Sequence, residues 1–168
     1  MFNVNHIESM EELDLHITVI KKNEDELTEE EKQLVEQAKE ATYRSYAPYS
    51  NFRVGAAAAL DNGVTVTGNN QENSAYPSGL CAERTTLFYA NARYPEAKVK
   101  CLCIAARDTS GQFTKRPIAP CGACRQVMSE TEDRGGVDMK IILYGTDGIY
   151  IIRSVKDLLP VSFDSSFL

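Results

Sequence analysis

Patterns of hydrophobic and polar residues divide the 168-residue chain into strands and helices. Residues Leu13–Ile20 alternate apolar and polar side chains, which predicts a strand near the N-terminus. A helix is predicted next, because Thr28 and Glu31 form a capping-box sequence and apolar residues then recur at helical spacing until Pro48. The apolar face of this predicted helix consists of Leu34, Val35, Ala38, Ala41 and Tyr46.

The rest of the chain alternates between strand and helix patterns. Two apolar runs flank Asp61-Asn62-Gly63, a turn sequence that favours a hairpin because Asn and Gly tolerate positive φ. One helix is predicted from about Cys81 to Arg93, and another begins near Cys121. Further strands are predicted at 98–107, 139–145 and 148–153, and a short helix at 154–160. This order predicts one α/β domain with a mixed sheet and helices packed on it.

Length and charge narrow the function. The chain is long enough for one domain with its own core, and its formal net charge of −6 argues against a surface that coats polynucleotides. A small or neutral ligand fits better. We find no apolar run of about 18 residues and no signal-peptide layout at the start, which predicts a cytoplasmic protein without membrane contact. In such a protein, five cysteines indicate metal binding or catalysis rather than disulfides.

Three cysteines have the spacing of a metal site. Cys121 and Cys124 form a C-x-x-C pair at a predicted helix start, where both sulfurs lie on one face of the helix. Alone, the pair also fits a redox dithiol or two packed thiols. Cys81 begins another predicted helix, and helix N-termini favour the thiolate form that binds zinc. Three protein ligands leave one tetrahedral position for water, which is the arrangement of a catalytic zinc.

The remaining cysteines and histidines do not extend this ligand set. Cys101 and Cys103 alternate along an apolar strand and are expected to pack in the core. The two histidines, His6 and His16, lie in the N-terminal segment and are expected to be solvated. The predicted zinc ligands are therefore the three helix-start thiols alone.

Glu83 supplies the base that such a site needs. A water activated by zinc requires a neighbouring group that accepts its proton and passes it on. Glu83 follows Cys81 by two residues. By itself, it also fits an ordinary glutamate favoured by the dipole of the first helical turn. The combination of C-x-E with P-C-x-x-C favours the catalytic interpretation.

At this point the sequence resembles a known family. The stretches "CAER" and "PCGACRQ" resemble the zinc cytidine deaminases, in the form with three cysteine ligands. "YAPYSNFRVGAA", "NQENSAYPSGLCAER", "PCGACRQVM" and "LLPVSF" are similar to the small homotetrameric deaminases of free nucleosides. The resemblance implies a single-domain three-layer sandwich, with a mixed five-stranded sheet and helices on both faces. It implies a deaminase domain over 28–168, whereas residues 1–27 fall outside it as an extension in which we expect an extra strand.

The resemblance also implies roles around the substrate. Asn70 and Glu72 match the pair that binds the ribose 3′-hydroxyl, although alone they also fit ordinary loop residues. Phe52 matches an aromatic residue beside the base, and also fits simple core packing. Ala82 matches a residue whose backbone N–H binds the 2-carbonyl of the base.

Three more residues complete the expected site. Tyr76 matches a cavity-wall residue, although the chain has Ser74 where the family usually has alanine. Phe163 resembles the aromatic residue that a neighbouring subunit contributes, which implies shared active sites. Three thiolates on one Zn²⁺ leave a formal charge of −1, and Arg84 is expected to offset this excess by donating to the thiolates.

The predicted function is hydrolytic deamination of free cytidine and deoxycytidine to uridine and deoxyuridine plus ammonia, a reaction of pyrimidine salvage. One Zn²⁺ per subunit and no organic cofactor are expected. Glu83 is expected to accept a proton from the attacking water, to protonate N3, and to deliver the proton to the leaving amine. Two alternatives stay open at this stage. A deaminase of blasticidin S shares the cysteine patterns, and only Asn70 and Glu72 argue against it. A structural zinc domain would need a fourth ligand.

Overall fold

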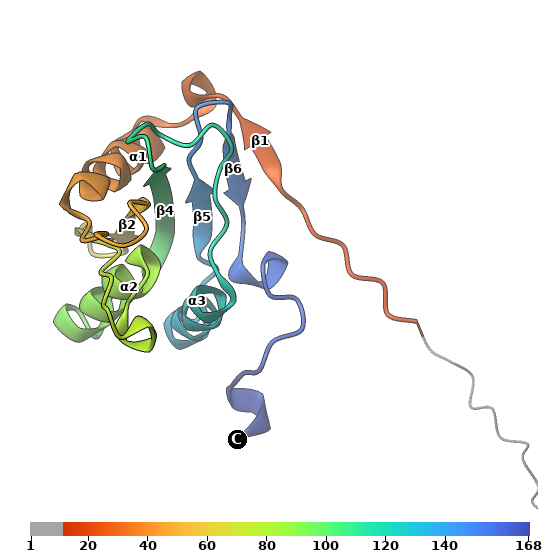
Figure 1. Cartoon of the computed structure of the whole chain (residues 1–168). Helices are drawn as coiled ribbons and strands as arrows, with labels where there is room; N and C mark the ends of the chain where they lie inside the picture. The colour runs from red at the N-terminus through yellow and green to blue at the C-terminus, as the bar shows by residue number, and fades with distance from the viewer. Residues whose placement is uncertain (1–11) are drawn as a thin grey trace, which may run out of the picture.

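A computed structural model describes residues 12–168, in which one mixed sheet carries helices on both faces (Figure 1). The strand order is β1-β6-β5-β4-β2-β3. The pair β4 and β5 is parallel, and the other neighbours are antiparallel. The predicted mixed α/β sheet is confirmed, with six strands instead of five. The strands are β1 Ile20–Lys22, β2 Arg53–Leu60, β3 Thr65–Asn69, β4 Val99–Arg107, β5 Lys140–Leu143 and β6 Ile149–Ile152.

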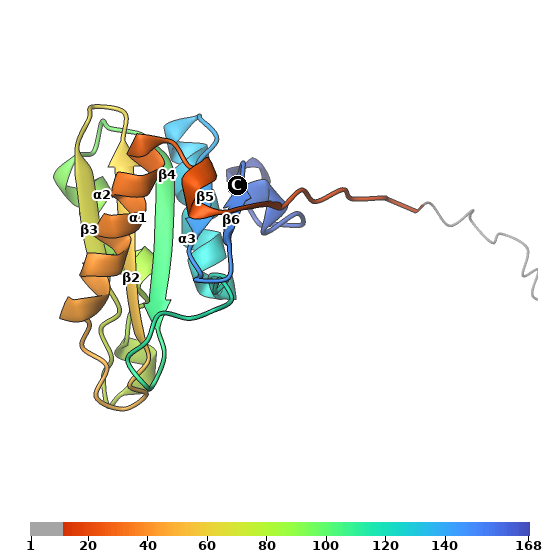
Figure 2. The same ribbon diagram turned by 90° about the horizontal axis from the view of Figure 1, so that it is seen from above.

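The helices form the two outer layers. Helix α1 (Glu29–Ala41) lies on one face, and α2 (Ala82–Arg93) and α3 (Gly122–Gly135) lie on the other (Figure 2). Side chains of β4 alternate between the two cores: Leu102 belongs to the core under α2 and α3, and Cys103 to the core under α1. No helix within residues 12–168 is long and apolar enough to cross a membrane.

Helix α1 begins as the sequence predicts and ends earlier. The Thr28 hydroxyl accepts from the Glu31 N–H at 3.2 Å, and the Glu31 carboxylate accepts from the Thr28 N–H at 3.0 Å, which completes the capping box. The α-helix ends at Ala41, and a 3₁₀ turn over Thr42–Arg44 follows it. In this turn the Thr42 hydroxyl donates to the Lys39 carbonyl at 2.7 Å. Tyr46 therefore lies beyond the helix and is exposed, contrary to its predicted place on the apolar face.

The strand predicted at Leu13–Ile20 is wrong in position. Residues 12–19 form no strand, and β1 covers only Ile20–Lys22. The reason is the partner: β1 pairs antiparallel with β6, and Ile20 pairs with Ile151, one residue before β6 ends at Ile152, so β6 offers no partner to residues 13–18. Alternation marks a chain that can form a strand, but a ladder needs a neighbour. The four apolar residues of the pattern are exposed: Leu13, Leu15, Ile17 and Val19.

The β2–β3 hairpin positions α2. Its turn at Asp61-Asn62-Gly63 has Gly63 at φ 82°, as the turn sequence predicts. Gly68 in β3 lies against Thr86 of α2, and a Cβ at this position would come within 2.5 Å of the Thr86 hydroxyl and 2.9 Å of its backbone nitrogen. The glycine therefore lets α2 pack directly on the strand, and α2 begins directly after Cys81.

We predict that Gly68→Ala lowers the free energy of unfolding by about 1–3 kcal/mol, because the added methyl group must push α2 away from β3. Zinc content should also fall, since Cys81 is the N-cap of α2 and is displaced when the helix moves. Urea denaturation and metal analysis measure both effects. Gly135→Ala is the matched control, because a Cβ there meets nothing closer than 3.7 Å. Equal stability of the two variants would contradict the close-packing argument.

Candidate functional site

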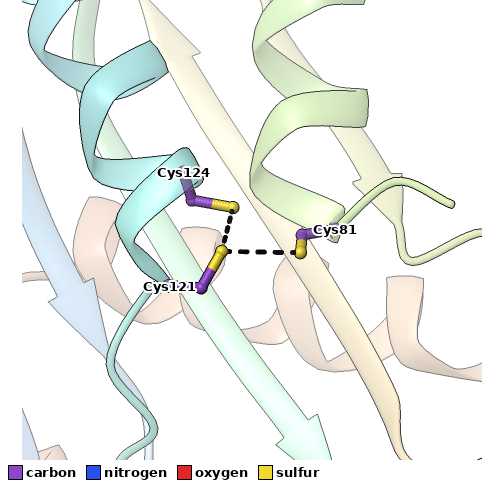
Figure 3. Close-up of side chains that lie close together, drawn as sticks. All are labelled: Cys81, Cys121 and Cys124. Atoms are coloured by element: carbon purple, nitrogen blue, oxygen red, sulfur yellow. Dashed lines mark hydrogen bonds between the residues drawn. The ribbon is translucent and has the colours of Figure 1, made fainter. Parts of the chain in front are cut away.

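Three sulfur atoms converge at the starts of two neighbouring helices (Figure 3). Cys81 is the N-cap of α2, Cys121 is the N-cap of α3, and Cys124 lies in the first turn of α3. The Sγ atoms of Cys81 and Cys121 are 3.9 Å apart, and those of Cys121 and Cys124 are 3.4 Å apart. All three ligand atoms lie within 4.8 Å of one another. The structure therefore brings together the three thiols that the sequence selected.

This geometry fits zinc. A tetrahedral zinc with Zn–S bonds of about 2.3 Å separates its sulfurs by about 3.8 Å, close to the two distances here. Within residues 12–168, the group of possible ligands contains these three cysteines and no histidine, aspartate or glutamate. A tetrahedral ion held here would keep one position for a small molecule.

Hydrogen bonds among the thiols change their pKa values, and Cys81 becomes the most acidic of those affected. Hydrogen bonding with Cys124, and then with the Arg84 guanidinium and Cys121, lowers the pKa of Cys81 to about 5. The pKa of Cys124 is raised, because its thiol donates to Cys81 and is buried. The Arg84 Nη2 lies 3.8 Å from the Cys81 Sγ, so the predicted contact between Arg84 and a thiolate is present. The Arg84 Nε is buried and has no hydrogen-bond partner.

The remaining cysteines and the described histidine lie apart from this group. Cys103 is fully buried beneath α1, and Cys101 packs against the same core. Burial raises the pKa of the Cys101 thiol to about 12, so it stays protonated at neutral pH. His16 is exposed, and His6 lies outside the described residues.

Glu83 lies in the first turn of α2, two residues after Cys81, and is only 4% exposed. Its side chain lines the same cavity as Cys81 and Cys121. Burial raises the pKa of Glu83, and the negative charge on Cys81 raises it further. A carboxyl group in such an environment holds a proton more readily than one in water, which suits a group that both accepts and donates.

The cavity beside the thiols has a volume of about 650 Å³. It is large enough for a small polar molecule of nucleoside size. Four of the predicted substrate residues line it together with Cys81, Cys121 and Glu83: Phe52, Asn70, Glu72 and Tyr76. The wall also includes Leu80, Ile118 and Ala119, which the sequence analysis did not single out because isolated apolar residues carry no local signal.

The other two predicted residues lie differently. Ala82 is fully buried and is the first residue of α2, where the backbone N–H has no acceptor within the helix. Phe163 is not among the residues that line this cavity. It lies on the C-terminal segment, is 59% exposed, and stacks on Phe167 with ring centroids 5.7 Å apart.

Asn70 and Glu72 are held by hydrogen bonds before any ligand arrives. The Asn70 Oδ1 accepts from the Ser45 hydroxyl and the Val54 N–H, and its Nδ2 donates to the Phe52 carbonyl at 3.0 Å. One N–H of the Asn70 amide therefore stays available.

The Glu72 carboxylate is held in the same way. It accepts from the backbone N–H groups of Tyr49 and Ser50 at 2.9 and 3.2 Å, and from the Ser50 hydroxyl. These bonds, with that of the Ser50 hydroxyl first, lower the pKa of Glu72 and keep it ionised. About one of its four acceptor positions stays available. The pair thus offers one donor and one acceptor, which is what a hydroxyl group needs. Ser45 and Ser50, which orient the pair, carry no signal in the sequence.

Comparisons with known proteins agree on one family. The model of the cytidine and deoxycytidylate deaminase zinc-binding region matches residues 28–137. A cytidine deaminase of Halalkalibacterium halodurans is 41% identical over 130 residues, which are 77% of this chain and 91% of that protein. One of Sporosarcina psychrophila is 38% identical over 80% of this chain and 92% of that protein.

Solved structures give the same result. A cytidine deaminase from Burkholderia pseudomallei has a TM-score of 0.68 at 39% identity, covering 82% of this chain and 100% of that one. A cytidine deaminase from Mycobacterium tuberculosis has a TM-score of 0.60 at 35% identity, covering 79% and 95%. The family's zinc-binding region together with the three-sulfur group assigns zinc as the cofactor. The chain therefore belongs to the cytidine and deoxycytidylate deaminase zinc-binding family.

Proposed function

We propose that the protein hydrolyses free cytidine and deoxycytidine to uridine and deoxyuridine with release of ammonia. The observation that carries this proposal is that one cavity combines three groups. These are two thiols of the zinc site, Cys81 and Cys121, the buried carboxyl of Glu83, and the Asn70–Glu72 pair. A metal, an acid–base group and a hydroxyl-binding pair together match a nucleoside whose base reacts.

The substrate is held by its sugar and its base. Asn70 donates to the ribose 3′-hydroxyl and Glu72 accepts from it, using the hydrogen-bonding positions that their internal bonds leave available. Phe52 and Tyr76 enclose the base in the cavity, and the N–H of Ala82 at the start of α2 donates to its 2-carbonyl. This arrangement directs C4 of the cytosine toward the thiols at the helix starts.

Glu83 moves the protons. Zinc, when held by Cys81, Cys121 and Cys124, would supply Lewis-acid chemistry that lowers the pKa of a water molecule toward neutral pH. The Glu83 carboxylate accepts a proton from the water that attacks C4 and delivers it to N3. It then accepts the proton of the hydroxyl group now on C4 and passes it to the exocyclic amine, so that the C4–N bond breaks, ammonia leaves and the carbonyl of uridine forms. Arg84 donates to the Cys81 thiolate and balances part of the negative charge on the three sulfurs.

We predict that the purified zinc-loaded chain converts cytidine and deoxycytidine, and that Glu83→Gln lowers kcat at least ~10³-fold while zinc stays bound, because an amide cannot carry the proton. Ultraviolet absorbance measures turnover, with blasticidin S as a third substrate. Glu130→Gln is the matched control, since this glutamate is exposed on α3. Near-normal turnover by Glu83→Gln would remove this residue from the mechanism. Turnover of blasticidin S without turnover of cytidine or deoxycytidine would identify the protein as a deaminase of that antibiotic instead.

We predict that Cys121→Ala and Cys124→Ala each abolish stoichiometric zinc and lower the melting temperature, because the energy of metal binding also stabilises the folded site. Atomic emission spectroscopy and calorimetry measure the two effects. Cys103→Ala is the control: it removes a buried thiol from the opposite core, so it should lower stability and leave zinc in place. Full zinc content in either ligand variant would exclude that cysteine from the ligand set.

The active unit is proposed to be a homotetramer in which neighbouring subunits share active sites. The support is the position of Phe163, which is exposed on the C-terminal segment and is not among the lining residues of its own cavity. An aromatic side chain in this position suits a contact with the substrate of a neighbouring subunit.

We predict that Phe163→Ala raises KM for cytidine roughly 2- to 10-fold, because an aromatic contact contributes about 0.5–1.5 kcal/mol. Mixing is the sharper measurement. Phe163→Ala chains keep Glu83 and Glu83→Gln chains keep Phe163, so reassembled mixtures should recover sites with a normal KM. Sedimentation measures the assembly directly. A fully active monomer, or mixtures that recover nothing, would contradict shared sites.

The division of the chain and its location are proposals of the same kind. Residues 28–168 are proposed to form the deaminase domain, supported by a family match that starts at residue 28. Residues 1–27 are proposed to be an extension, whose described strand β1 adds to the sheet beside β6. A cytoplasmic location is supported by the five free cysteines, since thiols that bind zinc must stay reduced.

A further inference from the structure

Arg125 connects two segments that are far apart in the sequence. It follows Cys124 directly on α3 and is half-buried. Its Nε donates to the Pro120 carbonyl at 2.9 Å, and its Nη1 donates to the Leu158 carbonyl, also at 2.9 Å. The guanidinium is a rigid plane, so the two carbonyls are fixed relative to each other as well as to α3.

On one side, Arg125 holds the backbone that carries a zinc ligand. Pro120 is buried and directly precedes Cys121, the exposed N-cap of α3. The backbone N–H of Arg125 also donates to the Cys121 carbonyl, at 3.0 Å. Cys124 is fixed by full burial, whereas Cys121 lacks such packing. The backbone bond is one that any residue at position 125 would make, so the contribution specific to arginine is the side-chain bond that holds Pro120 directly before Cys121.

On the other side, Arg125 holds the start of the C-terminal segment. This segment leaves β6 and passes beside α3 (Figure 1). Gln126, the next residue, donates to the Phe163 carbonyl at 2.8 Å, so two consecutive side chains of α3 hold residues 158–163. The segment has little packing of its own, because Val161 is 80% exposed and Phe163 59% exposed.

We propose that Arg125 is a positioning residue that couples the zinc site to the C-terminal segment. This rests on the proposed zinc site. With both carbonyls bound, the loop before Cys121 and the segment that carries Phe163 are ordered together. Such coupling is reciprocal. If attachment of the segment raises the affinity for zinc by some factor, zinc binding stabilises the attached segment by the same factor. Metal loading thereby prepares the residue that is proposed to reach the neighbouring subunit.

Zinc affinity is the first test. We expect Arg125→Met to raise the zinc Kd about 10- to 100-fold, the usual cost of removing a side chain that orients a metal ligand. Arg125→Lys should lie between this variant and the wild type, because an ammonium group replaces the two-pronged contact with one. Arg134→Met is the matched control on the same helix, since Arg134 donates only to the distant Pro95 carbonyl. Competition with a chromophoric chelator measures all four Kd values, and calorimetry checks folding.

Hydrogen exchange separates coupling from general loss of stability. In the wild type, removal of zinc should speed exchange of the Leu158 and Leu159 amides, which donate to the Val155 carbonyl at 2.8 and 3.0 Å. The factor should approach the ratio of the zinc Kd values of Arg125→Met and the wild type. In Arg125→Met these amides should exchange rapidly with or without zinc. In Arg134→Met they should respond to zinc as in the wild type.

Each outcome decides the proposal. A wild-type chain without zinc affinity would overturn the zinc site itself and the coupling with it. A wild-type chain that binds zinc, beside an Arg125→Met variant of equal affinity, would overturn the coupling alone. Zinc-dependent protection that persists in Arg125→Met would do the same, as would an equal loss of affinity in Arg134→Met. If Arg125→Met does not fold, the same two measurements on Arg125→Lys decide.

Discussion

Two helices begin beside each other on one face of the sheet, and the rest of the site depends on this arrangement. Helices α2 and α3 pack on the same core, and the cysteines at their starts place three sulfurs within 4.8 Å. The sulfurs lie at two helix N-termini, where the positive end of each helix dipole favours thiolates. The first turn of α2 also holds Glu83, so one of the three thiols, Cys81, and the proposed acid–base group are fixed by one element.

Local sequence signals predicted the elements that carry this site. The capping box at Thr28 and the turn at Asp61-Asn62-Gly63 are complete within a few residues, so their structures follow from the sequence alone. The C-x-x-C spacing likewise specifies one helix face. Convergence of Cys81 with that pair joins segments 40 residues apart, and spacing alone could not establish it. There, the sequence prediction relied on helix starts and on the family resemblance.

The sequence analysis was wrong or silent where a feature depends on residues that are distant in the sequence. Strand β1 is short because β6 is short, and the alternation in Leu13–Ile20 contains no information about β6. The roles of Ser45 and Ser50 follow from the fold of the loop around them, not from their own sequence context. The same is true of Arg125, whose two acceptors lie 5 and 33 residues away.

Orientation of polar groups by the backbone also bears on substrate selection. Asn70 and Glu72 obtain their orientation from bonds formed during folding, so a ligand that binds between them does not have to order them. Glu72 is half-exposed, so water can occupy its free acceptor position when no hydroxyl is present. A sugar that lacks the hydroxyl therefore leaves no unpaired buried group on Glu72, so the pair is expected to orient the sugar rather than to exclude such sugars. In the proposed site it binds the 3′-hydroxyl, a group that ribose and deoxyribose both carry, so the pair itself gives no preference between cytidine and deoxycytidine.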